Sequence, residues 1–319
     1  MTDMRAVGFT EAGDPSVLGI VTVPKPAPEP GQVLVAVAAA TVNPTDLGFR
    51  QGGRAMPEGM TPPYIPGMDL AGVVESVGPG VSRWQAGDRV MAAVSPWEPG
   101  GGAQAEYRTV DSGQLALVPD GWPLTDAATL PMNGLTVLAA YDLLALPPGA
   151  VVAVTGSAGI VGQYAIQLGT HRGLTMIGDA APADESLIAS FGAAHVVPRG
   201  EPMVAAVRSL YPDGVDAVID AALLGPAILP AVRDGGQLLA VRPYQGETAG
   251  GKAERDITIH LVLVGRHLHE GHRIAELAAL VGEGVLTLRV AEVLPAERAA
   301  EAHQRLEAGG VRGRLVLTF

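Results

Sequence analysis

Short apolar runs alternate with segments of helical spacing through the second half of the chain. The apolar runs predict strands at residues 151–155, 174–178, 195–197, 215–220, 237–241 and 259–264. Between them, apolar residues recur at helical spacing in segments near 159–169, 183–191, 201–210 and 224–233. Regular alternation of strand and helix is typical of an α/β fold with a doubly wound parallel sheet.

The first 122 residues follow a different pattern, in which short alternating runs are separated by turns rich in proline and glycine. Strands are predicted at residues 4–9, 32–39, 70–77, 88–92 and 105–110. This spacing predicts a barrel-like all-β domain. Two helices, at 125–130 and 135–146, lead from it into the α/β half. The chain ends with predicted helices at 273–281 and within 295–310 and strands at 290–293 and 314–319, and we expect this short stretch to pack on the N-terminal domain.

The stretch AVVAVTGSAGIVGQYAIQLG joins the first strand of the predicted parallel sheet to a helix through a glycine-rich turn. In a βαβ unit, such a turn presents unpaired N–H groups and the positive end of a helix dipole to a pyrophosphate. The residues predicted to bind a dinucleotide there are Ser157, Ala158, Gly159, Ile160 and Val161. Ser157 replaces the first glycine of the usual fingerprint, so a plain tight turn is the alternative.

Composition narrows the class of protein. Hydrophobic residues make up 48% of the chain and charged residues 17%, which is typical of a folded globular protein. A net charge of -12 argues against nucleic acid as a partner, because phosphate contacts need clustered Lys and Arg. The chain has no cysteine, which excludes disulfides, Cys-ligated zinc and thiol catalysis. Without a signal-peptide pattern or an apolar run of about 20 residues, we expect a cytoplasmic protein with no membrane partner.

Several further motifs occur along the chain, namely VNPTDLGFRQG, PPYIPGMDLAGVVESVGPGV, AGDRV, GGAQAEY, LPMNGLTVLAAYDLL, TGSAGIVG and ERAAEAHQRLEAGGVRGRLVLTF. Through them the chain resembles, over essentially its full length, the zinc-free medium-chain dehydrogenases/reductases of the quinone oxidoreductase (zeta-crystallin-like) group. The resemblance implies a GroES-like substrate domain made of residues 1–122 and 265–319 and a Rossmann cofactor domain at 123–264. It also implies an active-site cleft at their junction and a homodimer formed through the strand at 259–264.

The residues at the expected metal positions argue against zinc. Zinc-dependent relatives carry a Cys where this chain has Asn43 and a His-Glu pair where it has Met68 and Asp69. Asn and Met are not usable zinc ligands here, and the cysteine-rich zinc lobe is missing, so no metal is expected. One competing group has ligand-like residue types but is equally typical of a solvated loop, namely His267, His269 and His272.

The choice between NADH and NADPH stays open at this point. Asp179 lies about 20 residues beyond the glycine turn, where an acid often binds the ribose 2′-hydroxyl of NAD. No Lys or Arg lies between Gly178 and Ser190, which disfavours a 2′-phosphate. The family nevertheless more often uses NADPH, Asp179 falls one residue short of the relatives' NAD-selecting acid, and Arg199 could reach a phosphate. A residue in a helix N-cap region is the alternative for Asp179, and NADPH is preferred with NADH possible.

The resemblance and the chemistry of hydride transfer together name the remaining site residues. Hydride delivered to a quinone or to the β-carbon of an enone leaves negative charge on a carbonyl oxygen, which hydrogen-bond donors stabilise. The candidate catalytic donors are the amide of Asn43, in the family's N-P-x-D motif, and the phenol of Tyr64. Tyr64 is equally well explained as a packed aromatic. The resemblance also implies that Thr136 lies near the nicotinamide and that Val264 walls its pocket.

The predicted function is NAD(P)H-dependent reduction of an apolar quinone or α,β-unsaturated carbonyl compound without a metal. The alternative is a scaffold protein that binds a dinucleotide without turnover, since a Rossmann site needs no catalysis to bind. The polar residues Asn43, Asp46 and Tyr64 favour the enzyme, because a pure binder has no need of them beside a nicotinamide. Asp46 is expected to orient its loop through backbone hydrogen bonds.

Overall fold

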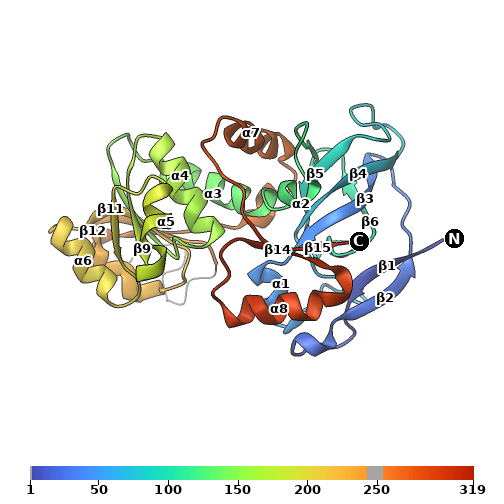
Figure 1. Cartoon of the computed structure of the whole chain (residues 1–319), viewed down its shortest axis with the longest axis horizontal. Coiled ribbons are helices and arrows are strands. Elements are labelled where there is room, and N and C mark those ends of the chain that lie inside the picture. Colours follow the sequence, from blue (N-terminus) through green and yellow to red (C-terminus); the bar gives the residue numbers. More distant parts are fainter. Residues whose placement is uncertain (1, 243–253) are drawn as a thin grey trace. The chain divides into compact units, whose positions relative to one another are not determined.

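The computed structural model describes residues 2–242 and 254–319 of the chain (Figure 1). The chain divides into two compact units, which are described separately below. Unit 1 comprises Met1–Met132, Leu268–Ala279 and Leu288–Phe319. Unit 2 comprises Asn133–His267 and Leu280–Thr287.

Unit 1 is built around a seven-stranded sheet. Its strands run in the order β14 (Val290–Pro295), β15 (Arg314–Thr318), β3 (Gln32–Thr41), β4 (Asp69–Val77), β5 (Arg89–Ala93) and β7 (Ala116–Leu117), and β6 (Tyr107–Asp111) pairs with β3. A separate antiparallel pair is formed by β1 (Asp3–Gly8) and β2 (Gly19–Pro24). β15 lies antiparallel to β3, with Val316 opposite Thr41, so the C-terminal stretch packs on the N-terminal strands as predicted.

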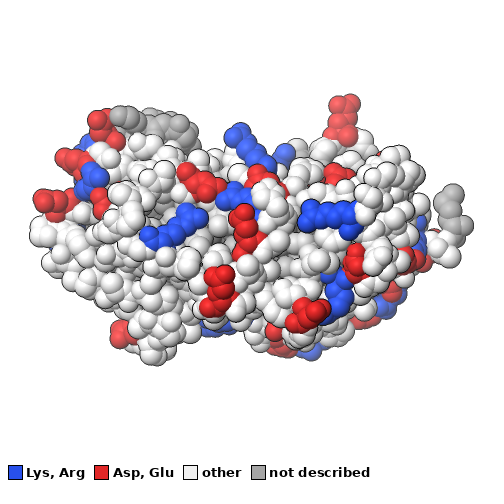
Figure 2. Space-filling model, turned by 90° about the horizontal axis from the view of Figure 1, so that it is seen from above, with Lys and Arg blue, Asp and Glu red and all other residues white. Residues whose placement is uncertain are grey.

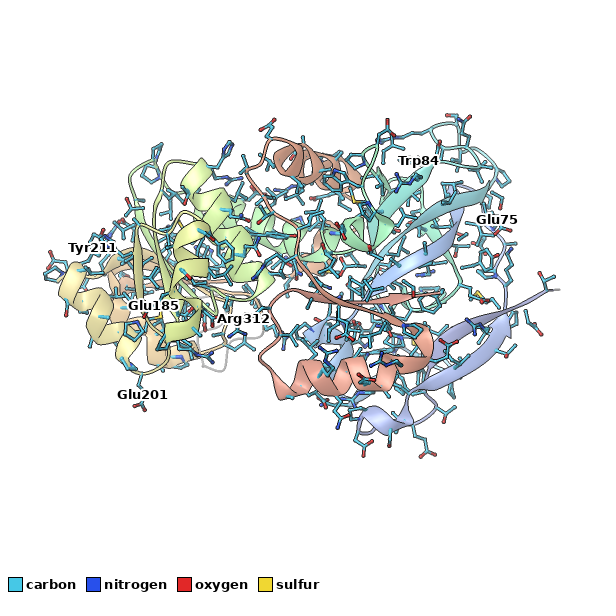
Figure 3. The ribbon with its side chains drawn as sticks, in the orientation of Figure 1. Glu75, Trp84, Glu185, Glu201, Tyr211 and Arg312 are labelled. Carbon is cyan, nitrogen blue, oxygen red and sulfur yellow. The ribbon has the colours of Figure 1, made fainter. Side chains whose placement is uncertain are left out.

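The core of unit 1 follows from alternation along its strands. Val33, Val35 and Val37 of β3 point to the same face and are at most 5% exposed. Trp84, labelled in Figure 3, packs into this core, and its indole N–H donates to the carbonyl of Ser112 at 2.8 Å. The sheet therefore buries one continuous apolar layer and satisfies the polar tip of its largest side chain.

The described part of unit 1 also contains the helices α1 (Pro44–Arg50), α2 (Leu124–Ala127), α8 (Ala299–Ala308) and most of α7 (Gly271–Gly282). α1 follows directly after Asn43 and packs against α8. β2 and β7 were not predicted. β2 carries a β-branched run, Ile20–Val23, that is typical of a strand, whereas β7 has two residues and no pattern to detect.

Unit 2 contains a sheet of six parallel strands (Figure 1). The strand order is β10 (His195–Pro198), β9 (Thr175–Ala180), β8 (Val151–Thr155), β11 (Val215–Asp220), β12 (Val232–Ala240) and β13 (Thr258–Leu261). Its main helices are α3 (Pro131–Leu144), α4 (Ile160–His171), α5 (Glu185–Ser190) and α6 (Pro202–Leu210). Counted in chain order the strands lie 3-2-1-4-5-6, the arrangement of dinucleotide-binding sheets, so the predicted fold class is confirmed.

Two predicted elements of unit 2 are wrong. The helix predicted at 224–233 is a 3₁₀ helix, Gly225–Ala231, that runs directly into β12, because Pro226 and Pro230 lack the N–H that an α-helix requires. The strand predicted at 259–264 ends at Leu261, and Val264 begins another 3₁₀ helix, Val264–His267. Ala240 opposite Leu261 is the last paired position of β12 and β13, and the N–H of Val262 donates to the carbonyl of Ala240 just beyond it.

Charged side chains of both signs are intermixed on the face shown in Figure 2. In unit 1, Lys25 forms an ion pair with Glu75, which is labelled in Figure 3. The same ammonium group lies 3.7 Å from the centre of the Tyr107 ring. Within residues 2–242 and 254–319, no helix combines the length and the apolar character needed to cross a membrane.

Candidate functional site

The turn between β8 and α4 depends on its glycines. Gly156 follows β8 with a φ of +67°, a conformation that side chains other than glycine disfavour. A Cβ on Gly162 would lie 2.5 Å from the carbonyl oxygen of Gly156, so only glycine lets the first turn of α4 pack this closely. Gly159 is the N-cap residue of α4, and no side chain caps it. The first N–H groups of α4, those of Ile160 and Val161, therefore have no intrahelical partner and are oriented to receive an anion.

Ser157 and Asp179 bind each other twice across the β8–α4 turn. The Asp179 carboxylate accepts the backbone N–H of Ser157 at 2.8 Å, and the Ser157 hydroxyl accepts the backbone N–H of Asp179 at 3.0 Å. Ser157 is 0% and Asp179 6% exposed. Asp179 lies inside β9, two residues before Ala181, the N-cap residue of the next 3₁₀ helix, so its side chain does not itself cap a helix.

Polar side chains also join the ends of β8 and β11, between which the strand order of the sheet reverses. Thr155 donates to Asp220 at 2.7 Å and accepts the N–H of Ala222 at 2.9 Å. Asp220 further accepts the N–H groups of Leu224 and Gly225, at 3.0 and 2.8 Å. Both side chains shape the turn after β11, at the place where parallel sheets of this order bind dinucleotides.

In unit 1, Asn43 belongs to a buried polar network with Thr41, Asp69 and Arg314. Its amide nitrogen donates to Asp69 Oδ2 at 2.9 Å, and its amide oxygen accepts from Arg314 Nη2 at 2.8 Å. Arg314 also donates to Thr41 and, at 2.9 Å, to Asp69 Oδ2, while Asp69 Oδ1 accepts the N–H of Met132 at 2.6 Å. All four network residues are at most 5% exposed. The Asn43 amide is therefore held in one orientation by buried partners.

Asp46 ties the start of α1 to a neighbouring loop, as expected. Its two carboxylate oxygens accept the backbone N–H groups of Asn43 at 2.7 Å and of Gly67 at 2.9 Å. Gly67 has a φ of +110°, and a Cβ there would lie 2.7 Å from the backbone nitrogen of Gln104. Burial raises the pKa of the Asp46 carboxyl to about 7, although both N–H bonds oppose the shift.

Zinc does not fit the positions that bind it in zinc-dependent relatives, which are Asn43, Met68 and Asp69 in this chain. The Asp69 carboxylate already receives hydrogen bonds from Thr41, Asn43, Arg314 and the backbone. The Arg314 guanidinium supplies the positive charge beside it. In the part of the chain that the structure describes, no three His, Cys, Asp or Glu side chains form a metal-binding group, so nothing supports the alternative site at His267, His269 and His272.

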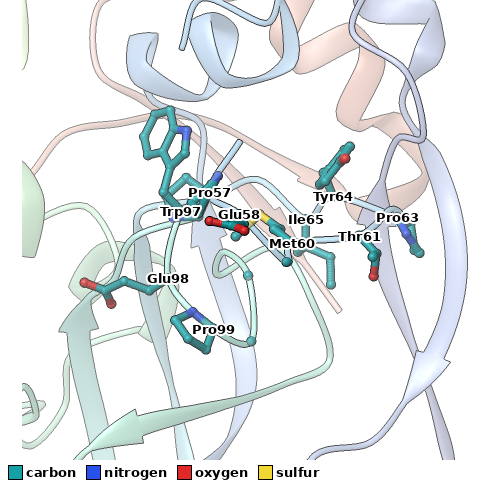
Figure 4. Close-up of a pocket in the computed structure, with 14 residues that line it drawn as sticks. Pro57, Glu58, Met60, Thr61, Pro63, Tyr64, Ile65, Trp97, Glu98 and Pro99 are labelled. Atoms are coloured by element: carbon teal, nitrogen blue, oxygen red, sulfur yellow. The ribbon is translucent and has the colours of Figure 1, made fainter. Parts of the chain in front are cut away.

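A pocket of about 440 Å³ lies in unit 1 between the loops 57–65 and 96–101 (Figure 4). Two aromatic side chains in its wall, Tyr64 and Trp97, pack on Phe49 with ring centres 6.4 and 4.9 Å apart. Its other side chains are mostly apolar or acidic: Pro57, Glu58, Met60, Thr61, Pro63, Ile65, Pro96, Glu98 and Pro99. Such a pocket suits a small, flat and largely apolar molecule.

The structure brings together only part of the predicted site. Tyr64 lines the pocket, and Asn43 is not among its lining residues. Thr136 is 7% exposed within α3, and Val264 is half-buried in its 3₁₀ helix. The sequence analysis missed Trp97 and Arg314. Trp97 carries a usable signal, an aromatic residue between prolines just before three glycines, whereas the final strand gave no indication that Arg314 is buried.

Two protein families match this chain. Residues 29–120 match the family described as alcohol dehydrogenase GroES-like domain, and residues 191–317 match the family described as zinc-binding dehydrogenase. The chain is 28% identical over 331 residues to the quinone oxidoreductase of Sus scrofa, an alignment that covers 98% of this chain and 97% of that protein. The solved structure of the quinone oxidoreductase from Coxiella burnetii covers 100% of both chains with a TM-score of 0.86 at 27% identity.

A second group of relatives matches over a shorter region. The synaptic vesicle membrane protein VAT-1 homolog of Rattus norvegicus is 37% identical over 199 residues, which covers 61% of this chain and 47% of that protein. The alignment thus spans about half the length of these curated relatives. Matches over the full length include quinone oxidoreductases. They also include the solved structure of the human synaptic vesicle membrane protein VAT-1 homolog-like protein, which covers 100% of this chain and 99% of that chain with a TM-score of 0.86 at 26% identity.

Proposed function

Because the chain belongs to the medium-chain dehydrogenase/reductase family, we propose that it is an NAD(P)H-dependent oxidoreductase that reduces a quinone or an α,β-unsaturated carbonyl compound. The observation that carries the proposal is the Asp69–Arg314 network. Asn43 and Asp69, at two of the relatives' zinc positions, bind each other, and Arg314 supplies the positive charge there, so we take the acceptor carbonyl to be polarised by hydrogen bonds. A bound nicotinamide supplies the hydride.

Unit 2 is proposed to hold the cofactor through the β8–α4 turn. Residues Ser157, Ala158, Gly159, Ile160 and Val161 would form the turn around the pyrophosphate. Within it the N–H groups of Ile160 and Val161 would donate to the phosphates, because those of Ser157 and Gly159 already bind Asp179 and Gly156. NADPH is the proposed cofactor, with NADH as the second choice. The basic residue available for a 2′-phosphate is Arg199, exposed at the carboxyl end of β10, whose backbone N–H donates to Ala180 of β9 at 3.0 Å.

Tyr64 is the proposed donor to the acceptor carbonyl. Its ring is fixed by Phe9, with centroids 5.6 Å apart, and its backbone exchanges two hydrogen bonds with the same residue. A phenol held this firmly at a pocket wall can stabilise developing oxyanion charge with little reorganisation. Tyr64→Phe is therefore expected to lower kcat about a hundredfold with little change in cofactor affinity. Tyr107→Phe, outside the pocket, is the matched control and is expected to retain full activity.

The other residues of the predicted site keep their roles as proposals. The Asn43 amide already donates to Asp69, so Asn43 ranks behind Tyr64 as a donor to the substrate. Thr136 and Val264 are proposed to contact the nicotinamide. A homodimer formed through β13, the last strand in the sheet order of unit 2, and a cytoplasmic location complete the proposal.

The test is oxidation of NADPH and of NADH, each with a simple quinone and with a simple enone as acceptor. Acceptor-dependent oxidation with at least one cofactor is expected. Cofactor binding without oxidation by any acceptor would instead support the dinucleotide-binding scaffold. Absence of binding by either cofactor would contradict both functions.

A further inference from the structure

We infer that Asp179 is a positioning residue that holds the phosphate-binding turn through Ser157, and that it does not select the cofactor by contacting the ribose. The inference rests on the proposed function, because it assigns a role within the same cofactor site. It also answers why this chain has a serine where the dinucleotide fingerprint has its first glycine.

Ser157 is held at three points. Its N–H donates to the Asp179 carboxylate at 2.8 Å, and its hydroxyl accepts the Asp179 N–H at 3.0 Å and donates to the carbonyl of Val154 at 2.9 Å. These bonds connect the turn to both β8 and β9. A glycine at position 157 lacks the hydroxyl and could make one of the three bonds. The serine and the aspartate therefore act as one clasp between the strand β9 and the turn.

The contact between Ser157 and β9 also requires the two segments to approach each other closely. A Cβ on Gly178 would lie 2.4 Å from Ile188 of α5, 2.9 Å from Ile166 of α4 and 3.1 Å from the Ser157 hydroxyl. Glycine at position 178 therefore lets both helices and Ser157 pack closely on β9. The neighbouring residues Gly178 and Asp179 thus serve the same contact from β9.

The burial of Asp179 argues against a ribose contact. A carboxylate that receives a ribose hydroxyl has to be open to the ligand, but Asp179 is 6% exposed and directs one oxygen into the turn. The residues that follow it at the end of β9 are Ala180 and Ala181, which offer no polar side chain. From residue 178 to residue 199, the sole Lys or Arg is Arg199. Selectivity between NADH and NADPH therefore has to come from residues other than Asp179.

The clasp makes a definite prediction for affinity. One N–H of the turn is used by Asp179, which leaves the N–H groups at the start of α4 for the pyrophosphate. Losing the carboxylate frees the turn to move, and both cofactors share the pyrophosphate. Both affinities should therefore fall together, with their ratio unchanged.

The experiment measures Kd for NADPH and for NADH by titration of the full-length protein and of Asp179→Ala, Asp179→Asn and Glu185→Ala. Asp179→Ala is expected to weaken both cofactors by about tenfold or more, with a ratio that stays within about twofold. Asp179→Asn keeps an oxygen that can accept the Ser157 N–H and is expected to recover most of the affinity. Glu185→Ala removes an exposed acid at the start of α5, labelled in Figure 3, and should change neither Kd.

Two results would overturn the inference. One is an Asp179→Ala protein that gains NADPH affinity relative to NADH by about tenfold, as expected of a ribose-contacting acid. The other is a folded Asp179→Ala protein with unchanged affinity for both cofactors. Should Asp179→Ala fail to fold, Ser157→Gly takes its place, with the same parallel loss expected and an unchanged affinity again contradicting the clasp. Failure of the unsubstituted protein to bind either cofactor would be a failure of the proposed function instead.

Discussion

Helix α1 begins and ends in buried polar clusters, and the two clusters differ in how completely their hydrogen bonds are satisfied. At the N-terminal end, Asn43 and Asp69 use both polar atoms of their side chains. At the C-terminal end, Arg50 and His303 are each 0% exposed, and Arg50 pairs with Glu307. Within the described residues, Nε and Nη1 of Arg50 and both ring nitrogens of His303 have no hydrogen-bond partner.

The fold is expected to depend more strongly on the N-terminal cluster than on the C-terminal one. An unpaired buried polar group costs about 1–3 kcal/mol, whereas a fully paired one is close to neutral or favourable. The N-terminal cluster leaves Nη1 of Arg314 unpaired, but its charges face each other. We therefore expect the N-terminal cluster to tolerate no loss of a partner and the C-terminal cluster to tolerate apolar replacement.

The largest effect is expected from Asp69→Ala. The change leaves the Arg314 charge buried without its carboxylate, which typically costs about 3–5 kcal/mol in the free energy of unfolding. Urea unfolding at neutral pH measures the loss, with Glu11→Ala, an exposed acid in the same unit, as the control. A loss below about 1 kcal/mol would show that the network does not hold unit 1 together.

The next effect is a pair of opposite pH dependences, one from each end of α1. Burial, together with the Arg50 charge, lowers the pKa of His303 to about 3, and burial raises that of Asp46 to about 7. Below pH 6.5, His303 is protonated in the unfolded state but stays neutral in the folded state. This group therefore makes the free energy of unfolding fall as pH falls. Between pH 7 and 3.8, folded Asp46 keeps a proton that the unfolded state releases, so this group makes stability rise as pH falls.

These two contributions nearly cancel between about pH 4 and 6.5. Removing one of the two groups should reveal the pH dependence that comes from the other. The free energy of unfolding should then change by at most about 1.4 kcal/mol per pH unit. His303→Leu should then gain stability relative to the unsubstituted protein as pH falls, and Asp46→Asn should lose it. Urea unfolding at pH 4.5, 5.5 and 6.5 measures both slopes, and slopes of the same sign would contradict the assignment.

The smallest effect is expected at pH 7 from one apolar replacement in each of the two clusters. His303→Leu removes two unpaired ring nitrogens and is expected to raise the free energy of unfolding by about 1 kcal/mol. Thr41→Val removes the donor to Asp69 and should lower it by about 1–3 kcal/mol. Thermal unfolding followed by circular dichroism compares the two, and a loss in both variants would remove the distinction between the ends.

The sequence predicted most of the fold because local patterns carry it. The strand–turn–helix at β8 and α4 was clear from a short apolar run, a glycine turn and helical spacing. The strand predicted at 259–264 continues three residues beyond the end of β13 at Leu261, because pairing with β12 ends there. The apolar residues at 224–233 recur at helical spacing, but Pro226 and Pro230 lack the N–H groups of an α-helix, and the segment forms a 3₁₀ helix.

The site was less predictable because its polar contacts join distant positions. Arg314 reaches Asp69 from 245 positions away, and no local pattern marks either residue as a partner. Sequence spacing offered Asp179 as a ribose-binding acid. Its carboxylate instead accepts the N–H of Ser157, 22 positions away, and spacing alone does not reveal this buried contact. Tyr64 was named from its motif, whereas Trp97 beside it depends on how two loops fold together.

The central claim is that this chain transfers hydride from a nicotinamide cofactor to a conjugated carbonyl compound. The direct measurement uses NADPH and NADH carrying deuterium at either face of the nicotinamide C4, with an enone acceptor, and mass spectrometry of the product. The account predicts that one face delivers one deuterium to the β-carbon, while a solvent proton adds to the α-carbon and the oxidised cofactor is released. Enone reduction without deuterium in the product, or no reduction with either cofactor, would contradict it.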